Sequence, residues 1–137
     1  MTTVSVRYIV NDVDEAAEFY AQNLGFQLEM HPNPAFAMLS LGDLRLVLVS
    51  PVGADHPGGG SRPLPDGTPQ RPGGWNRIML QVDDVETTAA ALRHDGVRFR
   101  TDIITGVGTK QVMIEDPSGN PIEIYQPLRA EARLMAP

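Results

Sequence analysis

Apolar and polar residues alternate along several short segments of this chain, a pattern typical of β-strands whose two faces differ. Two longer segments instead repeat apolar residues at helical spacing, each preceded by an aspartate and followed by a glycine. Asp12 and Asp84 are the expected N-caps, and Gly25 and Gly96 the expected stops. The pattern predicts strands at 4–10, 26–31, 35–40, 44–50, 75–82, 97–101, 110–115 and 121–126, and helices at 13–23 and 85–95.

The order of these elements repeats, so the chain is predicted to contain two βαβββ modules, at 4–50 and 75–127. Residues 51–74 join the modules, and 13 of these 24 residues are Gly or Pro, too many for the interior of a helix or strand. The joint is expected to be either a linker or a partly ordered flap. We expect one α+β domain over residues 1–127 and a tail at 128–137.

The two faces of the strands have different compositions. One face is almost entirely aliphatic and is expected to pack on the helices. The opposite face, assigned by alternation on the first, fourth, fifth and last strands, is mixed, and a face of this kind is either exposed to water or lines a polar cavity. Its candidate residues are Ser5, Arg7, Arg45, Val47, Arg77, Met79, Gln81, Glu123 and Tyr125.

Composition narrows the function classes. The formal net charge of −6 and the scattered basic residues argue against nucleic-acid binding, which requires a basic face. No apolar run approaches the length of a membrane span, no signal peptide is expected, and cytoplasmic location is the default. The chain has no cysteine, so it has no disulfide or thiolate chemistry. Its three histidines, His31, His56 and His94, lie far apart in the sequence and suggest no shared site.

Two segments carry a family resemblance: NDVDEAAEFYAQNLGF at 11–26 and DPSGNPIEIYQP at 116–127. They resemble the vicinal-oxygen-chelate superfamily, which includes glyoxalase I, extradiol dioxygenases and bleomycin-resistance proteins. The resemblance covers residues 4–127 and implies a cupped mixed sheet, with the ligand held in the cup and two copies forming a homodimer. The mixed face would then line the cup.

The resemblance also implies four metal-ligand positions, which fall at Ser5, Val47, Arg77 and Glu123. Only Glu123 is a good metal ligand, whereas a catalytic or structural site requires about three or four protein donors. We therefore expect neither a metal nor another cofactor. Arg77 is expected either to pair with Glu123 or to bind an anionic group of a ligand directly.

Three functions remain open at this stage. The first is metal-independent binding of a small molecule in the cup, with Trp75 either as a wall of the site or as a packing anchor. The second is a glyoxalase-type lyase, isomerase or dioxygenase in which Glu123 is the catalytic residue. The third is an interaction module whose cup is filled by large side chains. Fold alone does not decide among them.

Overall fold

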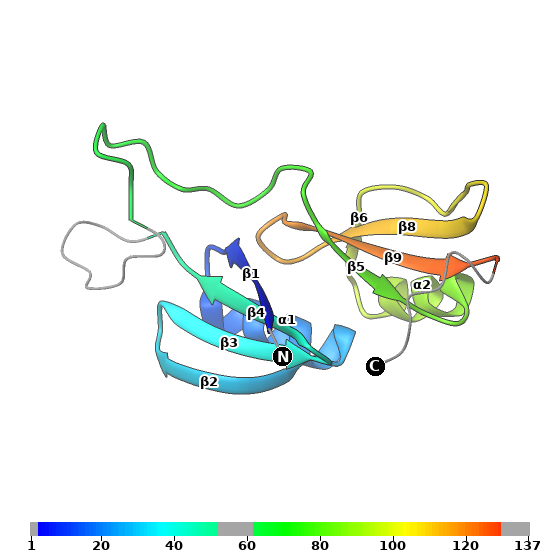
Figure 1. Ribbon diagram of the computed structural model, residues 1–137, viewed down its shortest axis with the longest axis horizontal. Helices are drawn as coiled ribbons and strands as arrows, with labels where there is room; N and C mark the ends of the chain where they lie inside the picture. Colours follow the sequence, from blue (N-terminus) through cyan, green and yellow to red (C-terminus); the bar gives the residue numbers. More distant parts are fainter. Residues whose placement is uncertain (1–2, 52–61, 130–137) are drawn as a thin grey trace. The chain divides into compact units, whose positions relative to one another are not determined.

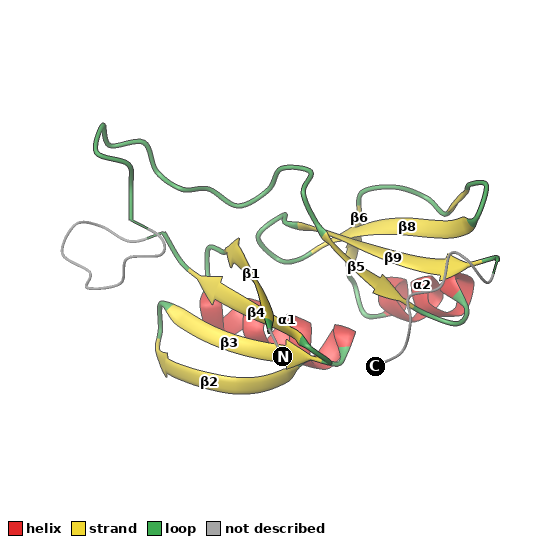
Figure 2. Ribbon diagram, viewed as in Figure 1, coloured by secondary structure: helices red, strands yellow, loops and turns green. Residues whose placement is uncertain are grey.

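The computed structural model describes residues 3–51 and 62–129 of the 137-residue chain. These residues divide into two compact units. The first unit comprises residues up to Gly73 together with Pro117–Asn120, and the second comprises Gly74–Asp116 and the residues from Pro121 onward. Each unit contains one helix and one mixed sheet, so the predicted α+β class is confirmed (Figure 2).

The first unit contains a four-stranded sheet in the order β1-β4-β3-β2. Its strands are β1 (Val4–Ile9), β2 (Gln27–Asn33), β3 (Phe36–Leu41) and β4 (Leu44–Val49). β1 runs parallel to β4, and the other neighbouring pairs are antiparallel. The tight turn between β3 and β4 at Gly42-Asp43 lies where the sequence predicts it, and Gly42 has a φ of 58°, which glycine adopts without strain.

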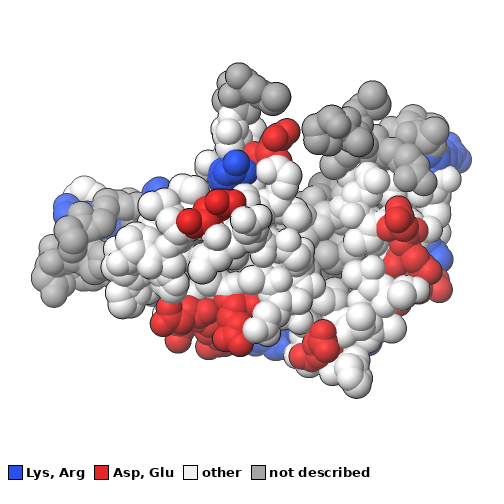
Figure 3. Space-filling model, turned by 90° about the horizontal axis from the view of Figure 1, so that it is seen from below, with Lys and Arg blue, Asp and Glu red and all other residues white. Residues whose placement is uncertain are grey.

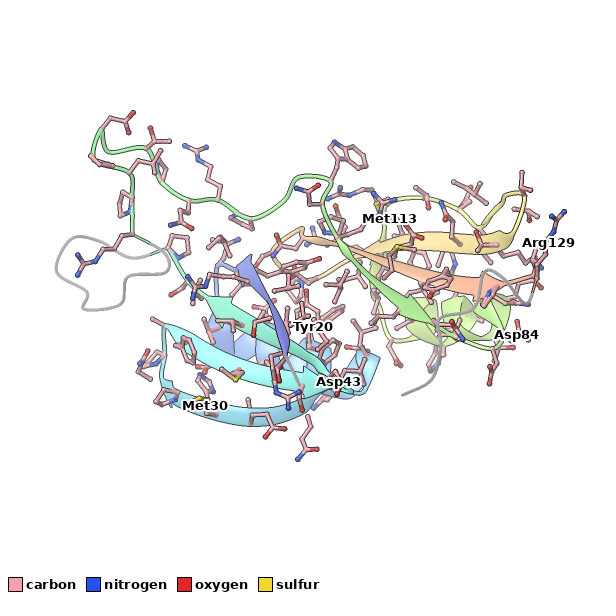
Figure 4. The ribbon with its side chains drawn as sticks, in the orientation of Figure 1. Tyr20, Met30, Asp43, Asp84, Met113 and Arg129 are labelled. Atoms are coloured by element: carbon pink, nitrogen blue, oxygen red, sulfur yellow. The ribbon has the colours of Figure 1, made fainter. Side chains whose placement is uncertain are left out.

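Helix α1 (Val13–Leu24) covers one face of this sheet (Figure 1). It begins at Asp12, whose carboxylate accepts a hydrogen bond from the Glu15 N–H, and ends at Gly25 in the left-handed conformation. Tyr20 projects from the helix toward the strands (Figure 4), is completely buried, and makes edge-to-face contacts with three other rings. An aromatic cluster centred on Tyr20 therefore packs into a core that is otherwise aliphatic.

The second unit contains a five-stranded sheet with the path β5-β9-β8-β6, and β7 also pairs with β8. Its strands are β5 (Ile78–Gln81), β6 (Arg98–Phe99), β7 (Ile104–Thr105), β8 (Thr109–Glu115) and β9 (Pro121–Pro127). Helix α2 (Val85–His94) packs against the aliphatic face, where Ile122 and Ile124 of β9 and Val112 and Ile114 of β8 are buried.

The structure differs from the sequence prediction at three places in the second unit. β5 begins at Ile78 rather than at residue 75, so Trp75 and Arg77 precede the strand. The backbone turns there because Gly73 and Gly74 both have positive φ and the Trp75 carbonyl accepts a hydrogen bond from Arg77 Nη1. β6 is shorter than predicted. The two-residue strand β7 was not predicted, because it is too short to show an alternating pattern.

The turn between β8 and β9 belongs to the first unit. Asn120 is buried, donates a 2.7 Å hydrogen bond to the carbonyl of Ile9 and accepts one of 2.7 Å from the Gly73 N–H. Ser118 Oγ accepts a hydrogen bond of 2.8 Å from the Asn11 N–H. The turn therefore satisfies main-chain groups at the end of β1 and at the end of the joining segment.

The joining segment has local structure in its described part, residues 62–73. Leu64 and Thr68 are linked by a main-chain hydrogen bond of 2.9 Å, and Gln70 Nε2 donates to the Arg62 carbonyl. Burial is low along most of this stretch. His56 and the glycines at 58–60 lie outside the described residues, so the choice between linker and flap stays a prediction.

Replacing Asp84 with alanine is expected to destabilise the protein at neutral pH and to have little effect in acid. Hydrogen bonds from the Thr87 hydroxyl and main-chain N–H, and then from the Glu86 N–H, lower the pKa of Asp84, the N-cap of α2. A lowered folded-state pKa contributes stability that is present above about pH 4 and is lost as the pH falls through the folded-state value. Urea unfolding at neutral and acid pH measures the difference in the free energy of unfolding between Asp84→Ala and the unaltered protein.

The control is Asp84→Asn, which keeps an N-capping oxygen but cannot ionise. Its free energy of unfolding at neutral pH should be higher than that of Asp84→Ala. Its free energy of unfolding should also change less between neutral and acid pH than that of the unaltered protein. An equal loss for Asp84→Ala at both pH values would contradict the assigned role of the carboxylate.

Candidate functional site

The candidate residues from the sequence fall into two groups. Ser5, Arg7, Arg45 and Val47 lie in the first unit, and the register pairs Ser5 with Arg45 and Arg7 with Val47. Arg45 Nη1 bonds to the main-chain carbonyls of Gly42 and Leu44, which is a local structural role. The other candidates lie in the second unit, where contacts join most of them: Trp75, Arg77, Met79, Gln81, Glu123 and Tyr125.

Glu123 and Arg77 form an ion pair at the centre of the second group. The side chain of Glu123 is only 5% exposed, and that of Arg77 is 28% exposed. Arg77 donates from Nε at 3.0 Å and from Nη2 at 2.8 Å, and both bonds end on Oε1 of Glu123. The predicted contact between these two residues is therefore confirmed.

The geometry of the pair leaves one carboxylate oxygen available. Arg77 uses its third nitrogen, Nη1, to donate a hydrogen bond of 3.1 Å to the Trp75 carbonyl. Within residues 3–51 and 62–129, no hydrogen bond to Oε2 of Glu123 is present. The site thus has an acceptor to offer, whereas each of the three nitrogens of Arg77 already donates a hydrogen bond within the protein.

The neighbouring strands place two rows of side chains around this pair. The register aligns Met79 of β5 and Met113 of β8 with Glu123. Two residues further along β9, Tyr125 is aligned with Gln81 and Gln111. Met113 lies on β8 in Figure 4. We call this surface the carboxylate face: Met79, Gln81, Gln111, Met113, Glu115, Glu123 and Tyr125.

Tyr125 is a buried phenol on the carboxylate face. Its hydroxyl donates to Gln81 Oε1 at 3.4 Å, a long hydrogen bond. Burial, and to a smaller extent the negative charge of Glu123, raises the pKa of Tyr125 above its ordinary value. The phenol is therefore neutral at physiological pH and can donate a hydrogen bond.

Three residues of the carboxylate face, and an arginine that bonds to one of them, were not identified from the sequence. Gln111, Met113 and Glu115 share the parity of the mixed face through the β8–β9 register, so the alternation in β8 could have revealed them. Arg100 follows the short strand β6, and its sequence position gives no signal. In the structure its guanidinium bonds to Oε2 of Glu115 at 3.0 Å and to the Gly74 carbonyl at 2.6 Å.

The donor set does not fit a divalent metal ion. Across the described part of the chain, no group of three or more His, Cys, Asp or Glu residues is arranged to hold one. At the candidate position a single carboxylate is already bonded to a guanidinium, and its neighbours in register are methionines. Divalent ions of the zinc and iron type need more nitrogen, oxygen or thiolate donors than this.

The surface charge gives no support for a nucleic-acid interface. On the face shown in Figure 3, acidic side chains form several separate groups and few basic side chains appear. The net charge of −6 agrees with this distribution. In addition, none of the described helices has the length and apolar character that a bilayer crossing requires.

Comparison with known proteins identifies the family. The model of the Glyoxalase/Bleomycin resistance protein/Dioxygenase superfamily matches residues 3–124, so the chain belongs to this superfamily. A search of curated protein sequences finds no match.

Solved structures include relatives of both binding and enzymatic type. TnmS3, an antibiotic binding protein from Streptomyces sp. CB03234, is 28% identical, with a TM-score of 0.65 and coverage of 93% of this chain and 97% of that chain. A superfamily member from Sphaerobacter thermophilus is 24% identical, with a TM-score of 0.70 and coverage of 92% and 97%. A lactoylglutathione lyase from Agrobacterium tumefaciens is 19% identical, with a TM-score of 0.69 and coverage of 91% and 92%. The last two show a shared fold alone.

Proposed function

We propose that this protein binds a small organic molecule on the carboxylate face, without a metal ion or another cofactor. The observation that carries the proposal is the Arg77–Glu123 pair, because a guanidinium nitrogen 2.8 Å from Oε1 of Glu123 competes with a metal cation for that oxygen and partly offsets the negative charge that would attract it. Exposed Met79 and Gln81 beside buried Glu123 and Tyr125 offer a polarizable surface with a few fixed polar groups, as in small-molecule sites. The antibiotic-binding neighbour at 28% identity supports the same class of function.

Native mass spectrometry combined with elemental analysis of the purified protein tests this proposal. We expect a non-covalent organic adduct of low mass and far less than one equivalent of transition metal. A stoichiometric transition metal bound through Glu123 would refute the proposal. We also expect Arg77→Met to lose the adduct. Arg93→Met, a change on helix α2 at the opposite face of the sheet, should keep it.

A catalytic alternative rests on the same carboxylate. Oε2 of Glu123 accepts no hydrogen bond from the described residues, so it is able to accept a proton from a ligand. The neutral phenol of Tyr125, two residues further along β9, is a hydrogen-bond donor for the same ligand. This would make the protein a metal-free lyase or isomerase. For the metal-dependent dioxygenase chemistry of the superfamily, residues 3–51 and 62–129 offer no group of three metal donors. Turnover of a thiohemiacetal or an epimerisable thioester that disappears in Glu123→Gln would favour the alternative.

Assembly and location are part of the proposal as well. We propose a homodimer in the cytoplasm, from the family resemblance and from the absence of cysteine in the sequence. Light scattering after size-exclusion chromatography measures the mass in solution and tests the dimer.

A further inference from the structure

Trp75 is the only tryptophan of the chain, and it is exposed although large aromatic residues are usually well buried. Its side chain and backbone together are 66% exposed. Exposure of this size within a single copy does not fit the simple packing-anchor role that the sequence left open. The question is what holds the ring in place.

Arg100 holds one face of the ring. The centre of its guanidinium lies 4.6 Å from the centroid of the Trp75 ring, which is a cation–π contact. The same guanidinium is fixed by Glu115 at 3.0 Å and by the Gly74 carbonyl at 2.6 Å, and the Arg100 side chain is 18% exposed. Arg100 is therefore an ordered support, and its charge is offset by Glu115.

The backbone that carries the ring is fixed as well. Arg77 Nη1 donates to the Trp75 carbonyl, and Arg100 Nη1 donates to the Gly74 carbonyl. Gly73 and Gly74 have φ values of 107° and 85°, which a residue with a Cβ rarely adopts. Two arginine side chains therefore hold Gly74 and Trp75, two successive residues of the second unit, although the segment is neither helix nor strand.

We infer that Trp75 is a pre-organised stacking platform for a flat aromatic ring of the ligand, with Arg100 as its positioning residue. The inference deepens the proposed function and rests on it. With one face of the indole covered by Arg100, the exposed area is available for offset stacking, which aromatic rings favour. Ordering the ring before binding avoids the entropic cost of immobilising it afterwards. Arg77 bonds both to the Trp75 carbonyl and to Oε1 of Glu123, so the backbone of the platform and the carboxylate share one guanidinium.

Fluorescence of Trp75 tests the inference directly, because no other tryptophan contributes to the emission. The probes are 9-aminoacridine, a flat cation, and 1-aminoadamantane, a cage-shaped cation that also carries an amino group. We expect 9-aminoacridine to quench Trp75 emission in a saturable way and to bind at least about tenfold more tightly than the cage amine. Calorimetry gives both affinities without relying on fluorescence.

Variants separate the platform from its support. We expect Trp75→Ala to weaken 9-aminoacridine binding about tenfold and Trp75→Phe to weaken it less, because the smaller ring still stacks. Arg100→Met should increase acrylamide quenching of Trp75 in the free protein and weaken binding severalfold. Arg93→Met is the matched control, because this arginine contacts Phe99 instead.

Three results would overturn the inference: no saturable quenching up to millimolar 9-aminoacridine, equal affinity for the flat and cage amines, or unchanged acridine affinity in Trp75→Ala. Each is distinct from failure of the proposed function, which is decided by the adduct and metal content of the unaltered protein. An organic adduct that survives Trp75→Ala would leave the function standing and remove the platform.

Discussion

Replacing Arg77 with methionine is expected to lower the free energy of unfolding by about 3 kcal/mol. The substitution leaves Glu123, whose side chain is 5% exposed, without its ion-pair partner. No other described residue donates to this carboxylate, so the remaining charge would be poorly compensated. Because Arg77 is partly exposed, the expected loss of stability lies at the lower end of the range observed when one partner of a buried ion pair is removed. Urea unfolding followed by circular dichroism measures the change.

A double-mutant cycle isolates the pair from other effects of the substitution. Arg77→Met combined with Glu123→Met removes both charges, and well-packed apolar replacements of a buried pair are often close to neutral. The double variant should therefore be more stable than Arg77→Met alone. The cycle also needs Glu123→Met alone: if the losses of the two single variants add up to the loss of the double variant, the ion pair does not stabilise the second unit. Measuring the organic adduct in the same variants by native mass spectrometry compares ligand binding with the free energy of unfolding.

Replacing Tyr20 with alanine is expected to lower the free energy of unfolding by about 4 kcal/mol, because it leaves a large cavity beneath α1. Tyr20 is completely buried, and its ring lies 5.2 Å from that of Phe19, 5.5 Å from that of Phe26 and 6.4 Å from that of Tyr8. Phe19 lies on α1, Phe26 directly precedes β2, and Tyr8 lies on β1, so the loss of packing affects the whole first unit. Urea unfolding again provides the measurement.

Tyr20→Phe is the control for this core position. It keeps the three ring contacts and removes only the hydroxyl, so the expected loss is about 1 kcal/mol. A comparable loss in the two variants would mean that the hydroxyl, rather than the packing of the aromatic cluster, determines the stability of this core.

Much of the fold was predictable because its signals are local. Asp12 and Asp84 cap the helices as their positions predict, and the turns at Gly42-Asp43 and 116–120 fall between strands as expected. Alternation also placed Met79, Gln81, Glu123 and Tyr125 on one face. β7 was missed, because two residues cannot show a period.

The candidate site was predictable only in part. The Arg77–Glu123 contact follows from neighbouring parallel strands, although Arg77 lies just before β5 rather than within it. The stack of Arg100 on Trp75 joins residues 25 positions apart in the sequence through the shape of a glycine turn. Such a contact depends on tertiary geometry, and neither charge nor periodicity along the chain encodes it. No local sequence pattern identifies the organic molecule that binds.

The position of the turn at 117–120 has a consequence for how the protein is made. Because Asn120 and Ser118 satisfy the main-chain groups of Ile9 and Asn11, the amino-terminal unit is not continuous in sequence. During synthesis, Ile9 and Asn11 cannot form these hydrogen bonds until more than a hundred further residues have left the ribosome. A fragment ending at the glycine pair would lack these partners, so we expect proteolytic nicking of the 62–72 segment to leave the two halves associated rather than to release an independent amino-terminal piece.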